Sequence, residues 1–320
     1  MPEPKIVFMG TPEFAVPSMQ ALHRRFPLTA VVTTPDRERG RGRKKQFSEV
    51  KQAALELGLP EDRILQPEQL RDPEFVQAIQ ALQPDIIVVL AFRILPHSVY
   101  SAARLGAFNI HGSLLPKYRG AAPINWAIIN GETETGLTAF LLADRVDTGN
   151  ILMRESLPIP ADATFGDMYY NMMPIAAGMT VTVCERLLRE GTDIQAEAQD
   201  DAFATPAPKI FREDCRIDWS LKAETIRNFV RGVSPVPGAF TMLDDASFKI
   251  YRAELCGDND VHLADGECLV TQRDILFGCG AGECLRALEV QVQGKKRMSA
   301  DDYVRGYRGP ARRMTESTTL

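Results

Sequence analysis

The sequence lacks the features that mark membrane-embedded or exported proteins. Its longest apolar runs, such as Ile86–Phe92, are far shorter than the roughly 20 residues that a membrane-spanning helix needs. The first residues, Met1–Pro4, carry neither a basic segment nor an apolar one, which argues against a secretory or transit peptide. We therefore expect a cytoplasmic protein that has no contact with a membrane.

Cysteine and histidine are scarce. The six cysteines form no CxxC pair, and a chain of 320 residues can bury a core without disulfides, so we expect reduced thiols. Cys279 and Cys284 could be considered as metal ligands, but none of the four histidines lies near them in the sequence. Two buried thiols are the better interpretation of this pair, and we predict no metal site.

Positive charge is also not in excess, because the formal net charge is −5. This value argues against attraction of the whole molecule to nucleic acid. Two segments differ from the average. Residues 37–45 (RERGRGRKK) carry six basic residues against Glu38, and residues 286–313 carry eight basic residues against three acidic ones. Together they suggest that a polyanion is held at defined places, although either segment alone could be a solvated loop or a frayed terminus.

The first half of the chain alternates between strand patterns and helix patterns. Apolar or β-branched runs occur at Lys5–Met9, Leu28–Thr34, Ile86–Leu90, Ala107–His111 and Gly136–Leu142. Helical patterns start at Pro12, extend from a Ser48 cap through Leu57, and cover Pro73–Leu82. This alternation predicts βαβ crossovers and a mostly parallel sheet, so we expect residues 1–194 to form a Rossmann-like α/β catalytic domain.

The pattern changes after this first half. Residues 195–209 (QAEAQDDAFATPAPK) consist largely of Ala, Asp and Pro, a composition that predicts a linker. A helix is expected from Ala223 to Arg231, and Leu288, Val290 and Val292 then alternate with polar residues, as in a half-buried antiparallel strand. Residues 210–320 are therefore expected to form a smaller β-rich domain, which fits the prior of about two domains for this length.

Two polar residues at the end of a predicted strand are candidates for chemistry. Asn109 and His111 are two positions apart, so their side chains leave the same face of the strand roughly 7 Å apart. Gly112 and Ser113 end the strand, which places the pair at its carboxyl end, where open α/β sheets bind ligands. From spacing alone, a hydrogen-bonded polar pair without a catalytic role is the plainer interpretation.

Two other segments invite chemical interpretations that the sequence does not favour by itself. Asp147-Thr148-Gly149 matches the triplet of aspartic proteases, which need two such carboxylates, and a single Asp in a turn usually forms only an Asx-turn. The Gly10–Phe14 loop follows the first strand, where Rossmann proteins bind phosphate. It lacks GxGxxG and carries bulky residues at positions of close approach, which argues against dinucleotide binding.

The stretch Asn109–Ile124 (NIHGSLLPKYRGAAPI) resembles the signature of the N10-formyltetrahydrofolate-dependent formyltransferases, an Asn-x-His-x-Ser-x-x-Pro core followed by a downstream Asp. The segments FMGTPEFAVPS, PDRERGRGRKK, RIDWS, SPVPGAF and GKKRMSADDYVRG are similar to the branch that acts on methionyl-tRNA. The resemblance covers about residues 5–308 in register. The chain therefore resembles the methionyl-tRNA formyltransferases.

This resemblance implies transfer of a formyl group from N10-formyltetrahydrofolate, as co-substrate, to the α-amino group of initiator methionyl-tRNA. It also implies that neither a metal nor a covalent intermediate is needed. Asn109 and His111 would donate hydrogen bonds to the oxyanion of a tetrahedral intermediate. Asp147 would keep His111 protonated and oriented, and could help to accept the proton of the amine.

The same resemblance implies ligand contacts. Four consecutive residues match the folate-contacting loop of the family: Ser113, Leu114, Leu115 and Pro116. The loop with Gly10, Thr11 and Phe14 would lie near the methionyl side chain, and Arg41 matches the position that meets the tRNA acceptor end. The second domain resembles an OB-like barrel, a fold that often binds nucleic acid. We expect a monomer.

One segment departs from the family pattern. Ala91–Pro96 (AFRILP) is one residue shorter than the Ala-aromatic-Gly-x-Ile-Leu-Pro segment that lines the folate pocket in the family, so the contacts of the pterin ring around Phe92 and Arg93 stay unassigned.

Three alternatives remain open. A formyltransferase that acts on a small amine, such as an amino sugar nucleotide or glycinamide ribonucleotide, would share the three catalytic residues but would not need RGRGRKK. A formyltetrahydrofolate hydrolase, or the hydrolase-like part of a dehydrogenase, would use water in place of the amine. A tRNA-binding protein without activity would not need the three residues intact.

Overall fold

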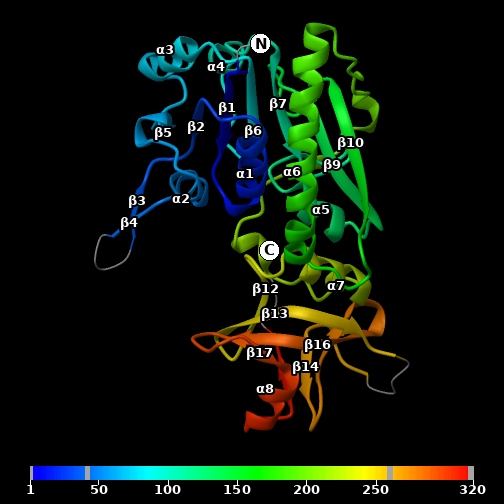
Figure 1. Ribbon diagram of the computed structural model, residues 1–320. Coiled ribbons are helices and arrows are strands. Elements are labelled where there is room, and N and C mark those ends of the chain that lie inside the picture. Colours follow the sequence, from blue (N-terminus) through cyan, green and yellow to red (C-terminus); the bar gives the residue numbers. More distant parts are fainter. Residues whose placement is uncertain (1–2, 40–43, 258–261, 316–320) are drawn as a thin grey trace. The chain divides into compact units, whose positions relative to one another are not determined.

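The computed structural model describes residues 3–39, 44–257 and 262–315. Two compact units divide the chain, and each is discontinuous in sequence (Figure 1). The first unit consists of Met1–Pro123, Thr135–Leu157 and Tyr169–Ala207. The second consists of Ile124–Glu134, Pro158–Met168 and Pro208–Leu320. Two short segments that interrupt the first unit in sequence therefore fold with the C-terminal part.

A seven-stranded sheet is the centre of the first unit. Its strand order is β10-β9-β7-β6-β1-β2-β5. The strands are β1 (Ile6–Gly10), β2 (Ala30–Val32), β5 (Ile64–Leu65), β6 (Ile86–Leu90), β7 (Gly106–His111), β9 (Glu134–Leu141) and β10 (Ile151–Pro158). From β5 to β7 all neighbours are parallel, and β9 pairs antiparallel with β7. The predicted mostly parallel α/β sheet is confirmed.

Helices cover both faces of this sheet, and most of those predicted from the sequence form. They are α1 (Val16–Arg25), α2 (Glu49–Glu56), α3 (Pro73–Leu82), α4 (His97–Tyr100) and α6 (Phe165–Glu190), together with the short turns η1 (Glu13–Ala15), η2 (Glu61–Arg63) and η3 (Gly191–Asp193). The Ser48 hydroxyl caps α2 by accepting a hydrogen bond from the Lys51 N–H. Of the described residues, none lies in a helix that is both long and apolar enough to cross a membrane.

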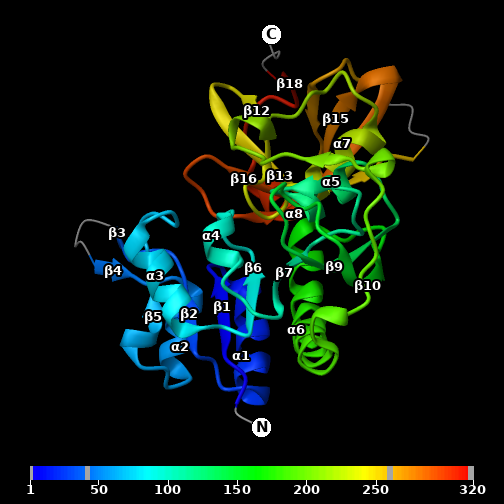
Figure 2. The ribbon, with the colours of Figure 1, turned by 90° about the horizontal axis from the view of Figure 1, so that it is seen from above.

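The alternation of side chains along the strands determines which helix packs on which face. Val7 and Met9 point into a cluster that contains Phe75 and Ile79 of α3 and Val99 of α4. The helices α1 and α6 lie side by side in both ribbon views, where they cover the other face (Figures 1 and 2). An Arg25–Glu185 ion pair of 2.7 Å joins these two helices.

The basic segment in the first unit has a short strand at each end. The strands β3 (Arg37–Arg39) and β4 (Lys44–Gln46) pair antiparallel. Next to them, the buried Lys51 ammonium donates to Asp36 Oδ2 and to Gln66 Oε1, each at 2.7 Å. The predicted contact residue Arg41 lies outside the described residues.

Most of the stretch that composition predicts as a linker packs in the first unit. Residues 195–207 contain a 3-10 turn, η4 (Asp201–Phe203), and a short strand, β11 (Pro206–Ala207), that pairs parallel with β8 (Arg119–Gly120). Glu197 also forms an antiparallel bridge with Ile151. Most of its residues are exposed, which explains why its composition resembles that of a linker.

The second unit is an antiparallel β half-barrel, which confirms the predicted β-rich domain. Its strand order is β12-β13-β16-β15-β14-β18, with β17 paired to β16. The elements are α5 (Pro123–Ile129), η5 (Glu213–Cys215), α7 (Ala223–Gly232), β12 (Ala239–Leu243), β13 (Ala246–Leu255), β14 (Glu267–Val270), β15 (Ile275–Cys279), η6 (Gly280–Gly282), β16 (Glu283–Val292), β17 (Met298–Ser299), α8 (Ala300–Gly306) and β18 (Arg312–Met314). The two end strands meet at a single bridge between Leu243 and Thr315.

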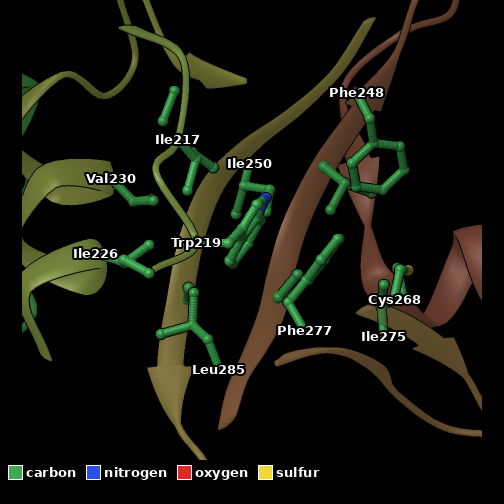
Figure 3. Close-up of a cluster of buried hydrophobic side chains, with 14 of the residues drawn as sticks. Ile217, Trp219, Ile226, Val230, Phe248, Ile250, Cys268, Ile275, Phe277 and Leu285 are labelled. Atoms are coloured by element: carbon green, nitrogen blue, oxygen red, sulfur yellow. The ribbon is translucent and has the colours of Figure 1, made fainter. Parts of the chain in front are cut away.

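A cluster of buried hydrophobic side chains forms the core of the half-barrel (Figure 3). The ring of Trp219 stacks on Phe277 with centroids 4.5 Å apart, and its indole N–H donates to the Thr241 hydroxyl at 3.1 Å. Ile226 and Val230 of α7 face the same cluster (Figure 3). The amphipathic pattern that predicts this helix therefore points its apolar side into the barrel.

The predicted alternation at Leu288, Val290 and Val292 is wrong for the first of these residues. Val290 is fully buried, but Leu288 is 39% exposed. The pairs Arg252–Glu289 and Ala253–Ala287 leave Leu288 without a partner across the ladder. It is the extra residue of a β-bulge, which interrupts the two-residue period.

All six cysteines are free thiols. Burial raises the pKa of Cys268 and of Cys279 to about 12, so these two stay protonated at neutral pH. Within residues 3–39, 44–257 and 262–315, no group of three or more His, Cys, Asp or Glu side chains is arranged to hold a metal ion.

Candidate functional site

The candidate site lies at the carboxyl end of β7, where Asn109 and His111 share one face of the strand. The antiparallel neighbour β9 places Phe140 opposite Asn109 and Thr138 opposite His111. The His111 side chain is buried, whereas Asn109 is half-buried. The sheet therefore presents both side chains at the edge where parallel α/β folds bind ligands.

A backbone carbonyl determines the orientation of the His111 ring. Its Nε2 atom lies 2.7 Å from the Tyr118 carbonyl oxygen. Because a carbonyl oxygen only accepts hydrogen bonds, Nε2 carries the proton and donates it. The ring also packs edge-on against Phe140, with centroids 6.5 Å apart. These contacts direct Nδ1 toward Asp147.

Asp147 lies in the turn between β9 and β10, and the fold brings its carboxylate to His111. Its Oδ2 atom is 3.8 Å from Nδ1 of His111, a distance too long for a direct hydrogen bond but short enough for an ion pair with an imidazolium. The same oxygen accepts the Gly120 N–H at 2.9 Å. Only 11% of the Asp147 side chain is exposed, so its charge acts in a setting of reduced screening.

The carboxamide of Asn109 makes no hydrogen bond to another residue within the described part of the chain. A half-buried amide without a protein partner needs water or a ligand to satisfy it. The side chain is therefore available as a hydrogen-bond donor. An amide donor, an imidazole and a carboxylate together suit the stabilisation of an oxyanion and the transfer of a proton.

The loop after β7 is held by its own hydrogen bonds. The Ser113 hydroxyl donates to the Lys117 carbonyl at 2.6 Å, and the Thr138 hydroxyl donates to the Ser113 carbonyl at 2.6 Å while it accepts the Leu115 N–H at 3.1 Å. Ser113 and Leu115 are buried, whereas Leu114 and Pro116 keep part of their surface. Of the four residues predicted to contact folate, Leu114 and Pro116 thus present accessible side chains.

The loop after β1 ends at the same edge of the sheet. Gly10 is required there, because a Cβ atom would lie 2.8 Å from the Cβ of Ala15. Phe14 packs on Tyr169 with ring centroids 5.1 Å apart, and its N–H donates to the Tyr169 hydroxyl. The buried Thr11 hydroxyl has no hydrogen-bond partner among the described residues. An unsatisfied buried hydroxyl next to a strand end points to a ligand or a bound water.

The shortened segment after β6 is tied to a neighbouring loop. Arg93 donates to the carbonyl oxygens of Pro67 at 2.7 Å and of Glu68 at 2.9 Å. Burial lowers the pKa of the Arg93 guanidinium below its ordinary value. A hollow of about 440 Å³ lies beside it, lined by Arg71, Ile94, Leu95, Pro96, His97, Ser98, Tyr100 and Asp144. The Tyr100 hydroxyl donates to Asp144 at 2.7 Å there.

Two residues that the sequence analysis did not single out also contact the site. Gln199 donates to the carbonyl oxygens of Asp147 and Gly149, and Arg119 holds the other end of the Gln199 amide. Arg119 lies inside the Asn109–Ile124 motif, which is the signal in the sequence that marks it. No pattern in the sequence marks Gln199, which lies in the stretch predicted as a linker.

The basic segment of residues 286–313 is largely paired with acids of the second unit. Five of its arginines form ion pairs: Arg286 with Glu254, Arg297 with Glu289, Arg305 with Asp302, Arg312 with Glu267 and Arg313 with Asp244. Lys295 and Lys296 are exposed and make no ion pair with the part of the chain that the structure describes. The charge available to a polyanion is therefore smaller than the count of basic residues indicates.

Comparisons with known proteins agree on one family. Residues 4–183 match the Formyl transferase family, and residues 209–308 match the Formyl transferase C-terminal domain. A methionyl-tRNA formyltransferase of Chlorobium phaeovibrioides is 44% identical over 316 residues, which cover 95% of each chain. One of Citrifermentans bemidjiense is 43% identical over 307 residues, covering 95% of this chain and 94% of the relative.

Solved structures share the fold. The structure of WlaRD, a sugar 3N-formyl transferase in the presence of dTDP and 5-N-formyl-THF, aligns with a TM-score of 0.67 at 18% sequence identity. The alignment covers 92% of this chain and 99% of that one. At this identity the similarity concerns the fold alone.

Proposed function

Because the chain belongs to the formyl transferase family, we propose that it transfers the formyl group of N10-formyltetrahydrofolate to the α-amino group of initiator methionyl-tRNA. One observation carries the choice of substrate. The relatives that are 43–44% identical over about 95% of the chain are named methionyl-tRNA formyltransferases. The protein is a formyltransferase, and charged tRNA as its substrate would place its activity in the cytoplasm.

The chemistry can be assigned to the three residues at the end of β7 and in the following turn. The amine nitrogen attacks the formyl carbon, and negative charge develops on the formyl oxygen of a tetrahedral intermediate. The unpartnered Asn109 amide donates to this oxygen. Nε2 of His111 is occupied by the Tyr118 carbonyl, so Nδ1 of the imidazolium is the second donor. The amine then gives up its proton, N10 takes up a proton, and the bond from carbon to N10 breaks.

Asp147 has two roles in this proposal. Its carboxylate faces Nδ1 of His111 at 3.8 Å and stabilises the imidazolium. The carboxylate can also accept the amine's proton, through a water molecule beside the pair. The Gly120 N–H contacts Oδ2, and Oδ1, which accepts no hydrogen bond from the described residues, is available for this task.

The ligands are assigned to loops at the same edge of the sheet. Folate contacts would come from the Ser113–Pro116 loop, where Leu114 and Pro116 are accessible, with the 440 Å³ hollow as the place for the pterin ring. The methionyl side chain would lie near Gly10, Thr11 and Phe14, whose buried Thr11 hydroxyl still lacks a partner in the described chain. Arg41 would meet the acceptor end of the tRNA, and the protein would act as a monomer.

The assignment is tested by following the formyl group. The protein is incubated with labelled N10-formyltetrahydrofolate and either charged initiator tRNA, an amino sugar nucleotide, or buffer alone. We expect formylmethionyl-tRNA as the only labelled product. Label on the amino sugar would favour a small-amine formyltransferase, and free formate in buffer would favour the hydrolase. No transfer to any acceptor would contradict the catalytic assignment itself.

A further inference from the structure

The segment that composition predicts as a linker holds the turn that carries Asp147. Gln199 Nε2 donates to the carbonyl oxygens of Asp147 at 3.0 Å and of Gly149 at 2.8 Å. These carbonyls lie on either side of Thr148, so a single amide group spans the turn. Gln199 belongs to the same compact unit as the turn.

The orientation of the Gln199 amide is determined by Arg119. Its Oε1 atom accepts hydrogen bonds from the Arg119 guanidinium at 2.7 and 3.2 Å. Arginine offers only donors and carbonyls only accept, so the amide cannot be reversed without losing all four contacts. The Arg119 side chain is 14% exposed, and Asp201 binds it with an ion pair of 2.8 Å. The Gln199 amide is therefore held in one orientation.

The Asp147 turn needs such support. Asp147 has a φ of +56°, in the left-handed region that residues other than glycine enter at a cost of about 1 kcal/mol or more. Gly149 is pressed against β9, where a Cβ atom would meet the Leu141 carbonyl oxygen at 1.6 Å. Without the two Gln199 hydrogen bonds, the peptide groups around Thr148 could rotate, and the Asp147 carboxylate would move relative to Nδ1 of His111.

The same segment also holds the other side of the site. The Thr205 hydroxyl accepts the Tyr118 N–H at 2.8 Å, and the Thr205 carbonyl accepts the Arg119 N–H at 2.8 Å. Tyr118 provides the carbonyl that orients His111, and the neighbouring Gly120 provides the N–H that binds Asp147. Both partners of the His111–Asp147 pair are thus positioned by residues 199–205.

We propose that Gln199 is a positioning residue for formyl transfer, which acts by holding the Asp147 turn so that the carboxylate faces His111. The proposal rests on the proposed function, in which Asp147 stabilises the imidazolium. It predicts a loss of turnover without a loss of substrate binding, because Gln199 touches neither ligand in that assignment. Such a loss must also depend on the presence of the Asp147 carboxylate.

The test uses Gln199→Glu, which keeps the length of the side chain and the contact with Arg119 but turns an oxygen toward the two carbonyl groups. Gln199→Ala removes both hydrogen bonds without adding a charge. The matched control is Gln195→Ala, an exposed glutamine of the same segment whose side chain makes one 3.5 Å contact, with the Asp193 carbonyl. We expect kcat to fall about 10- to 100-fold in both Gln199 variants, with KM values within about twofold, since a displacement of about 1 Å can cost about 100-fold. The control should match wild type.

A double-mutant cycle separates positioning from a general structural role. In an Asp147→Asn background, Gln199→Glu should change kcat less than about twofold, because the group that it positions is already lost. Effects that multiply in the double variant, or an unchanged kcat in both single variants, would overturn the proposal. Matching thermal unfolding midpoints verify that the variants fold.

Amide hydrogen exchange supplies a readout that is independent of the substrate. Peptides that cover residues 143–150 should exchange faster in Gln199→Ala and at the wild-type rate in Gln195→Ala. If wild type transfers no formyl group to methionyl-tRNA, the proposed function fails, but faster exchange in this turn would still support the role of Gln199. Unchanged exchange in both Gln199 variants would reject it whatever the substrate.

Discussion

The site at the end of β7 and the basic segment of residues 286–313 differ in whether their polar side chains have partners within the protein. At the site, the Asn109 amide has no protein partner within the described residues, and Nδ1 of His111 faces Asp147 across 3.8 Å. In the basic segment, five arginines are already paired with carboxylates. Polar groups that the fold leaves without partners are the ones that can act on a ligand.

In the second unit, the same contrast distinguishes charged side chains that stabilise the fold from those that are available to a ligand. Arg297 binds Glu289 through two guanidinium nitrogens and lies over the Tyr251 ring at 4.3 Å, so its charge serves the half-barrel. The neighbouring Lys295 and Lys296 are exposed, and no carboxylate in the described chain pairs with them. Three consecutive basic residues therefore have two different roles.

The largest effect is expected at the site. Replacing His111 by Ala should lower kcat about 100- to 1000-fold, because a donor to the developing oxyanion is lost. The dissociation constant of folate should change little, since the imidazole acts on the transition state rather than on the bound co-substrate. Steady-state kinetics and folate titration measure the two quantities.

The matched control for this prediction is His262→Ala, which removes an exposed histidine of the second unit. It should behave as wild type in both assays. A His111→Ala variant that keeps more than about a tenth of the wild-type turnover would remove the residue from the proposed mechanism.

A smaller effect is expected for the unpaired lysines. Removing Lys295 and Lys296 together should weaken tRNA binding and reduce the slope of log affinity against log salt by about 1 to 2, because each phosphate contact releases counterions. Turnover at saturating tRNA should stay close to that of wild type. Binding across a salt series measures the slope.

A charge-neutral change in the same segment sharpens the comparison. Arg297→Gln combined with Glu289→Gln removes this ion pair, and the 3.9 Å contact of Glu289 with Arg252, without changing net charge, and the salt slope should stay at its wild-type value. If this double variant lost as much affinity as the lysine variant, the distinction between paired and unpaired charges would be wrong. A flat salt dependence of wild type would contradict tRNA as the substrate.

The sequence predicts the helices and strands of the first unit well, because hydrophobic periodicity and helix capping depend on residues that are close in sequence. The helix at Pro73–Leu82 and the strand at Ile86–Leu90 form with the predicted bounds. Spacing makes Asn109 and His111 candidates and the family resemblance implies their roles, whereas their approach to Asp147 depends on the pairing of β7 with β9.

Properties that depend on distant partners could not be predicted. Gln199 reaches Asp147 across 52 residues, and nothing in a run of Ala, Asp and Pro indicates that contact. Counting charges in residues 286–313 missed the acids that neutralise them, because Asp244, Glu254 and Glu267 come from earlier strands and turns of the half-barrel. A linear count measures composition, whereas an available charge is a property of the fold.

The smallest effect is expected at Glu267, the carboxylate partner of one of these paired arginines. Arg312 of β18 donates to Glu267 of β14 at 2.8 Å, close to the bridge where the half-barrel meets its first strand. The pKa of Glu267 lies below its ordinary value because the Ala264 N–H and the Arg312 guanidinium stabilise the carboxylate. A lowered pKa means that this contribution to stability is present above the unfolded-state pKa and is lost as the pH falls through the folded-state pKa.

Glu267→Gln should therefore lower the unfolding midpoint slightly at pH 7, and the difference from wild type should vanish in acid. Asp265→Asn, which removes an adjacent exposed carboxylate, is the control and should show no such pH dependence. A Glu267→Gln difference that persisted unchanged into acid would show that the ion pair does not support the half-barrel, and that paired and unpaired charges there are energetically alike.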